Sequence, residues 1–207
     1  MEFQYKGLEA TLERLTVTQE EIDRQLKRLE GQDTSEFTPE ELRRNVAESL
    51  QDYYDRQAEE ELADKLLRQA AATLDEVPEE AEIDIVAQRQ LEILKNQLAD
   101  RNLTLESYCQ FMNTTQEQIF EEIREDAVQL VMVQKAIERI AELEQLTVQE
   151  EDVQKMCEDI CHRNQLSAGE LQELYDEAFA QAVRNSILTA KVLEIVRNNA
   201  KITTITL

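Results

Sequence analysis

Glycine, proline and histidine are scarce in this chain, whose 207 residues include three glycines, two prolines and one histidine. Glycine and proline are the residues that most often interrupt regular structure and form turns. Histidine is the side chain most often used as an acid, a base or a metal ligand near neutral pH. The composition therefore predicts long helices with short connections and leaves few residues for a catalytic centre. We expect an all-α protein that works by presenting surface.

Long apolar runs, a secretory signal and an even set of cysteines are also missing. No apolar stretch approaches the roughly 20 residues that span a bilayer. Residues 1–13 contain no basic region followed by an apolar one, which is the pattern of a secretory signal. The three cysteines do not suggest a disulfide framework. These absences predict a cytoplasmic protein with no membrane partner.

Acidic residues dominate the charge, with 45 Asp and Glu against 22 Lys and Arg and a net charge of −23. Such a surface repels the phosphate backbone of nucleic acids, so we expect no nucleic acid partner. The same charge would keep a protein in solution while apolar surface is exposed, and it would limit self-association.

Alternating patterns mark both ends of the chain, and helical patterns fill the middle. Leu8, Ala10 and Leu12 alternate with polar residues, which predicts an extended arm over 3–13. Residues 202–207 alternate again and predict a short C-terminal strand. Between these ends we expect helices over 18–30, 39–75, 79–101, 105–112, 116–144, 148–163, 168–176 and 178–199.

Capping boxes mark many of the expected helix starts. In this motif a Ser or Thr and a Glu or Gln three residues later satisfy each other's backbone N–H groups. The pairs are Thr18 and Glu21, Thr38 and Glu41, Thr115 and Gln118, Thr147 and Glu150, and Ser167 and Glu170. Pro39 and Pro78 fit first helical positions, where a missing N–H costs nothing. No linker rich in Gly, Pro or Ser divides the chain, which favours a single domain.

The expected helix over 39–75 carries an apolar residue at every fourth position. This stripe consists of Leu42, Val46, Leu50, Tyr54, Ala58, Leu62, Leu66, Ala70 and Leu74. Each step of four residues turns the stripe by about 40°, so one partner cannot cover all of it. Polar residues at 55–57 and 59–61 separate the stripe into two halves. We expect the halves to pack on different helices, in an elongated domain with protruding helical arms.

One cluster carries metal-ligand atoms, and it consists of Cys157, Cys161 and His162. The two cysteines lie four residues apart and share a helix face, but His162 is turned about 100° away, and the spacing is not that of a zinc site. We interpret the thiols as small buried apolar groups. Cys109 has no companion histidine or acid, and the scattered glycines build no phosphate-binding loop. We predict no catalytic residue, no metal and no cofactor.

Several segments, taken in their order, resemble the trigger factor family. Residues 5–9 and 15–23, with a short helix ending at Leu29, are similar to the linker that leads into the isomerase domain. The stretch Phe37-Thr-Pro-Glu-Glu-Leu-Arg-Arg-Asn-Val46 resembles the start of the C-terminal chaperone domain. Residues 77–98 resemble its next arm helix, and residues 187–202 resemble its last helix and exit.

The resemblance implies one trigger factor C-terminal or SurA-like domain over 1–207. It would have a linker and short helix in 1–36 and a helical body with arms in 37–207. Trigger factors also carry a ribosome-binding domain and an FKBP-like prolyl isomerase domain. Only seven residues separate Leu29 from Phe37, and nothing precedes Met1, so we expect both domains to be absent. The chain would then not be an enzyme.

What remains implies an ATP-independent molecular chaperone, a holdase, that binds hydrophobic segments of unfolded or nascent polypeptides between its arms. The candidate client-binding residues are Tyr54, Leu62, Leu66, Leu91, Leu94, Leu98, Phe111, Met112 and Phe120. The alternative is a helical structural or adaptor protein that oligomerises or binds one defined partner, and a homodimer is possible in either case. A heptad repeat would favour the adaptor, whereas the stripe over 39–75 drifts by fours and favours the chaperone.

Overall fold

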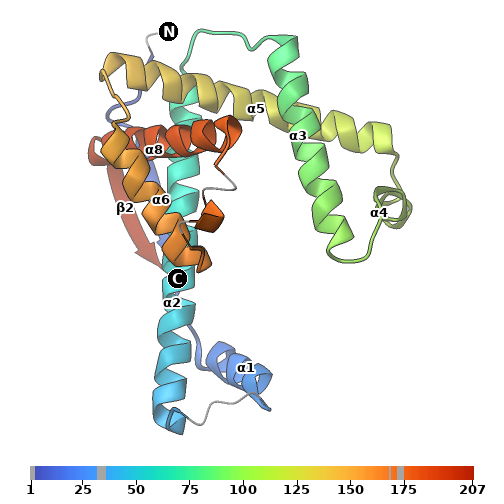
Figure 1. Cartoon of the computed structure of the whole chain (residues 1–207), viewed down its shortest axis with the longest axis vertical. Helices are drawn as coiled ribbons and strands as arrows, with labels where there is room; N and C mark the ends of the chain where they lie inside the picture. Colours follow the sequence, from blue (N-terminus) through green and yellow to red (C-terminus); the bar gives the residue numbers. More distant parts are fainter. Residues whose placement is uncertain (1–2, 32–35, 168, 172–174) are drawn as a thin grey trace. The chain divides into compact units, whose positions relative to one another are not determined.

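The computed structural model describes residues 3–31, 36–167, 169–171 and 175–207, most of which are helical. In chain order the elements are β1 (Glu9–Arg14), α1 (Gln19–Leu29), α2 (Pro39–Ala71), α3 (Glu80–Ala99), α4 (Leu105–Met112), α5 (Gln116–Leu143), α6 (Glu150–Asn164), α8 (Glu177–Asn198) and β2 (Lys201–Thr206) (Figure 1). The all-α fold class is confirmed. Within the described ranges, no helix combines the length and apolarity needed to cross a membrane.

The expected helix over 168–176 is only partly covered by this description. Residues 169–171 are helical, and residues 175 and 176 are not. Residues 168 and 172–174 lie outside the described residues, so the rest of this expected helix stays a prediction.

Capping boxes begin α1 and α2, as the sequence predicts. The Glu21 backbone N–H donates to Thr18 Oγ1 (3.3 Å), and the Thr18 N–H donates to the Glu21 carboxylate (2.8 Å). Thr38 and Glu41 make the same two bonds at the start of α2, whose first residue is Pro39. Two further predicted boxes are confirmed, at Thr115 and Gln118 and at Ser167 and Glu170.

Two predicted helix starts are wrong by about two residues. Helix α6 begins after Gln149 instead of Thr147, because the Asp152 carboxylate accepts the Gln149 backbone N–H (2.9 Å). The Thr147 hydroxyl instead accepts a hydrogen bond from the Gln149 side chain (2.6 Å). Helix α3 begins after Glu79, so Pro78 precedes the helix and is not its first residue. In both cases an acidic side chain, favoured at a helix N-terminus, sets the boundary.

The chain forms two compact units, each assembled from segments that are distant in sequence. Unit 1 comprises Met1–Tyr5 and Leu67–Asn198, and unit 2 comprises Lys6–Leu66 and Asn199–Leu207. The boundary cuts α2 between Leu66 and Leu67, so this helix contributes to both units. Every position of the apolar stripe from Leu42 to Leu74 is buried or half-buried. The boundary between the two units falls after Leu66, however, whereas the sequence placed the break of the stripe at the polar residues 55–61.

In unit 2, β1 and β2 form a parallel two-stranded sheet from segments at opposite ends of the sequence. Glu9 pairs with Lys201, and the register continues to Arg14 and Thr206. Leu12 on β1 is buried, and so is Leu8 just before it. Two strands were expected near these positions, at 3–13 and 202–207, but their pairing was not predicted. The sheet thus brings the first and last segments of unit 2 together.

Polar contacts hold helix α1 against α2, and Ile22 is the buried residue of α1. The Tyr54 hydroxyl donates to the Glu21 carboxylate (2.5 Å), and Arg43 forms an ion pair with Asp23 (2.7 Å). The hydrogen bond from Tyr54, followed by those from Thr18, lowers the pKa of Glu21 from 4.5 to about 2. The charged form of Glu21 is therefore stabilised in the folded state.

Replacing Glu21 by Gln should flatten the acid side of the stability profile. The folded-state pKa is lowered, so the stabilisation from Glu21 is fully present above its ordinary pKa of 4.5 and is lost as the pH falls to about 2. We expect the urea midpoint of Glu21→Gln to lie below that of the unmodified chain at pH 7 and to approach it near the acid limit. Urea unfolding measured across this range tests the prediction. Glu20→Gln, which removes a carboxylate from the same turn, is the control. If the urea midpoints of both variants changed equally with pH, Glu21 would not be the source of this stabilisation.

In unit 1, α3 crosses α5 (green and yellow in Figure 1) and packs against it around two alanines. Ala87 and Ala127 are completely buried, and Ile83 and Val131 complete the core of this contact. Small side chains at the centre let the two helix backbones approach closely. Ion pairs flank the contact, between Arg124 and the carboxylates of Glu80 and Asp84 and between Lys135 and Glu82 (2.9 Å). We call α3, α4 and α5 together the helical arm.

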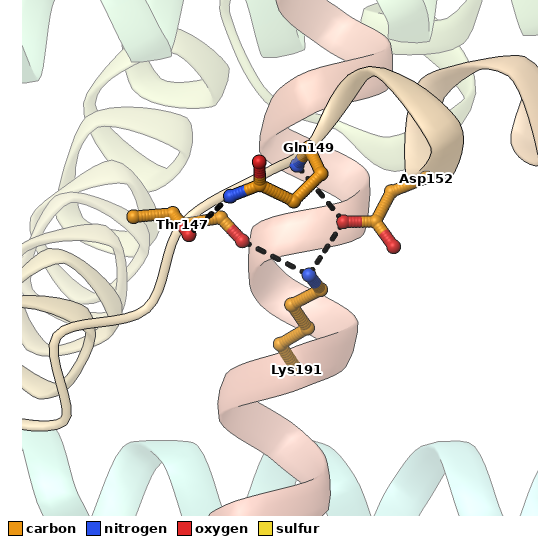
Figure 2. A network of polar contacts seen from close by, with 4 residues as sticks. All are labelled: Thr147, Gln149, Asp152 and Lys191. Atoms are coloured by element: carbon orange, nitrogen blue, oxygen red, sulfur yellow. Dashed lines mark hydrogen bonds and ion pairs between the residues drawn. The ribbon is translucent and has the colours of Figure 1, made fainter.

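A second cluster of unit 1 joins α6 to α8 through Val153, Val183 and Ile187. A polar network beside it fixes the start of α6 (Figure 2). Lys191 Nζ on α8 donates to the Thr147 carbonyl oxygen (2.9 Å) and to the Asp152 carboxylate (2.6 Å). Lys191, and after it the Gln149 backbone N–H, lowers the pKa of Asp152. The network therefore ties the acidic first turn of α6 to a cation of the neighbouring helix.

Candidate functional site

An open groove of about 380 Å³ lies along the helical arm. Its lining residues come from the end of α2, from the second half of α3 and from α5: Arg68, Gln90, Ile93, Leu94, Gln97, Ile123, Asp126 and Leu130. Four of these are apolar, and one of them, Ile123, also packs against the alanine contact that joins the two helices. We call this feature the arm groove.

The apolar walls of the arm groove are only partly covered. Ile93 and Leu130 are exposed, at 39% and 37%, while Leu94 and Ile123 are half-buried. Side chains from both α3 and α5 thus line an open groove. Arg68 and Asp126 add one charge of each sign to the rim. The groove can therefore accept apolar side chains without leaving an unopposed charge beside them.

Helix α4 presents two adjacent apolar side chains to solvent. Phe111 is 86% exposed and Met112 is 53% exposed, whereas Cys109 on the same short helix is buried. The helix begins at a capping box between Thr104 and Ser107 and ends at Asn113, which has a left-handed backbone conformation. These two caps fix both ends of an eight-residue helix, so Phe111 and Met112 occupy defined positions. We call them the exposed pair.

The cysteine cluster lies beside an open hollow at the C-terminal half of α6. Cys157, Cys161 and His162 line one hollow of about 590 Å³, together with Leu166 and Leu171. Burial, and next the nearby Cys161, raise the pKa of Cys157, which disfavours the reactive thiolate. Both thiols were expected to be buried but are only half-buried, whereas Cys109 is buried. Among the described residues, no group of three or more His, Cys, Asp or Glu side chains is arranged to hold a metal ion.

Among the described residues, six carboxyl groups have a clearly shifted pKa. Those whose pKa clearly departs from its ordinary value are Glu21, Glu41, Glu82, Glu117, Asp152 and Glu170, and every one is lowered. The causes are a hydrogen bond from the Tyr54 hydroxyl to Glu21, hydrogen bonds at helix caps, and hydrogen bonds from Lys135 and Lys191. A general acid at neutral pH requires the opposite shift, which burial produces. These carboxylates stabilise helices and helix contacts.

Comparison with known proteins identifies the family of this helical arm and body. The family model described as the bacterial trigger factor protein (TF) C-terminus matches residues 36–197. The chain belongs to the trigger factor C-terminal family. This confirms the resemblance seen in the sequence and places the chain in a family of chaperones.

Curated trigger factors from several bacteria are similar to this chain. That of Halalkalibacterium halodurans is 33% identical over 138 residues, which are 66% of this chain and 32% of the relative. That of Thermobifida fusca is 30% identical over 185 residues, which are 88% of this chain and 39% of the relative. That of Caldicellulosiruptor bescii is 28% identical over 174 residues, which are 83% and 40% of the two chains. The match thus spans about a third to two fifths of these trigger factors.

One solved structure is similar over nearly the whole trigger factor C-terminal chain. It is the crystal structure of a hypothetical Mycoplasma protein, MPN555, with a TM-score of 0.51 and 14% sequence identity. The match covers 99% of this chain and 88% of that one. At this identity the similarity concerns the fold alone.

The nine residues that the sequence suggested for client binding fall into three classes of exposure in this trigger factor C-terminal chain. Leu62, Leu66 and Leu98 are buried, so their side chains are covered by the chain itself. The half-buried ones are Tyr54, Leu91, Leu94 and Phe120. Phe111 and Met112 are exposed, and they form the exposed pair. The buried residues offer no free surface, and we leave them out of the candidate site.

Of the half-buried residues, only Leu94 lines the arm groove. Tyr54 lies in unit 2 and bonds to Glu21, and Phe120 packs on the α3–α5 core. Sequence reasoning missed Ile93 and Leu130, which also line the groove. The sequence did contain a signal for these two residues, because α3 and α5 both carry more apolar positions than a single buried face needs.

Proposed function

We propose that the chain is an ATP-independent holdase that binds apolar segments of unfolded or nascent polypeptides through the arm groove and the exposed pair. The observation that carries this proposal is the exposure of Phe111 and Met112 on α4 of the helical arm, since neither side chain belongs to the α3–α5 core. Large apolar side chains held in fixed positions at a surface are typical of sites that bind other proteins. Membership of the trigger factor C-terminal family supports the same function.

Binding of this kind is weak at each contact and tolerant of sequence. Burial of apolar surface contributes about 25 cal/mol per Å², and a fully buried side chain contributes about 1.5–3 kcal/mol. Several such contacts hold a segment, while the lack of directional bonds allows many sequences to bind and be released. Met112 adds adaptability because its thioether chain is flexible. The net charge of −23 keeps copies of the chain apart while this surface is exposed.

We further propose that the functional domain extends over residues 1–207, with a linker and short helix in 1–36 and the body and arms in 37–207. We expect it to act in the cytoplasm, to require no cofactor or metal, and to bind neither nucleic acid nor membranes. We also expect no prolyl isomerase activity, so a refolding reaction limited by proline isomerisation should not accelerate.

Aggregation of a denatured client, followed by light scattering, tests the holdase function. A several-fold molar excess of the chain should suppress the scattering, and ATP should make no difference. An unrelated helical protein of similar negative charge is the control, because it reproduces the charge without the apolar surface. An unchanged scattering trace would refute the function. Tight binding to one native protein, without binding to unfolded chains, would instead favour an adaptor.

A further inference from the structure

The outer edge of β2 carries backbone groups that the sheet does not use. Among the described residues β2 pairs only with β1. The Lys201 N–H donates to the Leu8 carbonyl oxygen (2.8 Å), and the Leu207 N–H donates to the Arg14 carbonyl oxygen (2.9 Å). In a parallel pair, alternate residues bond to the same neighbour, so 201, 203, 205 and 207 face β1. The N–H and C=O groups of 202, 204 and 206 therefore point away from β1.

The sequence of β2 leaves this edge unprotected. The strand reads Lys-Ile-Thr-Thr-Ile-Thr, and five of its six residues are exposed. Five are β-branched, none is proline, glycine or an acid, and the one charge lies at the first position. Natural sheets usually protect edge strands with internal charges, prolines, bulges or a covering element. An edge with these properties is suited to pairing with another strand.

We propose that the outer edge of β2 binds an extended segment of a non-native polypeptide as a third strand. This inference rests on the proposed holdase function and specifies a second way in which a client is held. Main-chain hydrogen bonds recognise an extended backbone without reading its side chains, which suits a chaperone with many clients. A third strand also strengthens the sheet, since two-stranded sheets are only marginally stable.

Charge favours a client over a second copy of the chain at this edge. Each copy carries a net charge of −23, so two copies repel one another, whereas β2 itself contains no acidic residue. An added strand would also contact side chains on both faces of β2. Ile205, which is 40% exposed, lies on one face, and Ile202, which is half-buried, lies on the other. These neighbours favour segments rich in β-branched and aromatic residues.

Substituting Thr204 by proline tests the proposal directly. The Thr204 N–H points away from β1, so Thr204→Pro removes one outward donor and leaves the β1–β2 ladder intact, as edge prolines do. Thr204→Val is the matched control, because it keeps the N–H and the branched shape. With a fluorescent ten-residue peptide rich in Val and Thr, we expect Thr204→Pro to weaken binding about three- to tenfold and Thr204→Val to leave it unchanged. Equal affinities for both variants would overturn the proposal.

A second measurement leaves the protein unaltered. The same peptide, N-methylated at every residue, cannot donate along either edge and should lose most of its affinity. Hydrogen exchange should show the amides of 202, 204 and 206 slowing on addition of the unmethylated peptide. If a client binds but these amides do not slow, the β2 edge proposal fails and the holdase function stands. If they are already protected without peptide, in a concentration-dependent way, a second copy occupies the edge and the proposal is wrong.

Discussion

Replacing the exposed pair by serine, in Phe111→Ser with Met112→Ser, should weaken binding of an unfolded client at least tenfold. Each side chain contributes about 1.5–3 kcal/mol when fully buried, and a tenfold change in affinity requires only about 1.4 kcal/mol. Because Phe111 and Met112 are 86% and 53% exposed, their loss should leave the stability of the chain unchanged. Fluorescence anisotropy with a labelled unfolded client measures the affinity, and thermal unfolding measures the stability.

Val77 provides the matched control for the exposed pair. It is 88% exposed, and it lies in the connection between α2 and α3, away from α4 in the sequence. Val77→Ser therefore removes a comparable exposed apolar group without touching the proposed surface. A similar loss of affinity in Val77→Ser would mean that clients adhere to any exposed apolar residue. An unchanged affinity in the double variant would exclude the exposed pair as a contact.

Leu62→Ala should lower the free energy of unfolding by about 2–5 kcal/mol, as truncation of a buried leucine does. Leu62 is only 2% exposed, and the alanine would leave a cavity in the middle of α2. Affinity for an unfolded client should not change under conditions where the variant is folded. Urea unfolding followed by circular dichroism measures the first effect, and anisotropy measures the second.

Leu130→Ala is the opposite case and serves as the control for Leu62. Its side chain is 37% exposed and lines the arm groove, so we expect a much smaller loss of stability together with a measurable loss of affinity. If Leu62→Ala weakened client binding without destabilising the fold, Leu62 would have to be accessible. That result would restore the sequence-based assignment of this residue.

Local features of the sequence predicted most helices of this chain. A capping box depends on residues three positions apart, so pairs such as Thr18 and Glu21 can be recognised without knowing the fold. The error at α6 came from a contact that the local sequence does not reveal. Thr147 was predicted as the cap, but Asp152 bonds both to the Gln149 N–H and to Lys191 of a distant helix.

Contacts between distant segments explain what could not be predicted. The apolar stripe of α2 indicates that Leu62 and Leu66 lie on one face, but not whether that face meets the chain itself or a client. Only the packed structure shows that both are buried and that Phe111 is not. The arm groove has the same origin, since it depends on where α3 crosses α5.

The pairing of Glu9 on β1 with Lys201, 192 positions later, imposes an order on co-translational folding. All segments of unit 1 have been made once residue 198 is added, whereas unit 2 still lacks its final strand. Until that strand emerges, the partner backbone along β1 is missing and Leu8 and Leu12 lose part of their cover. Vectorial synthesis therefore completes the unit that contains the helical arm first and closes the parallel sheet last.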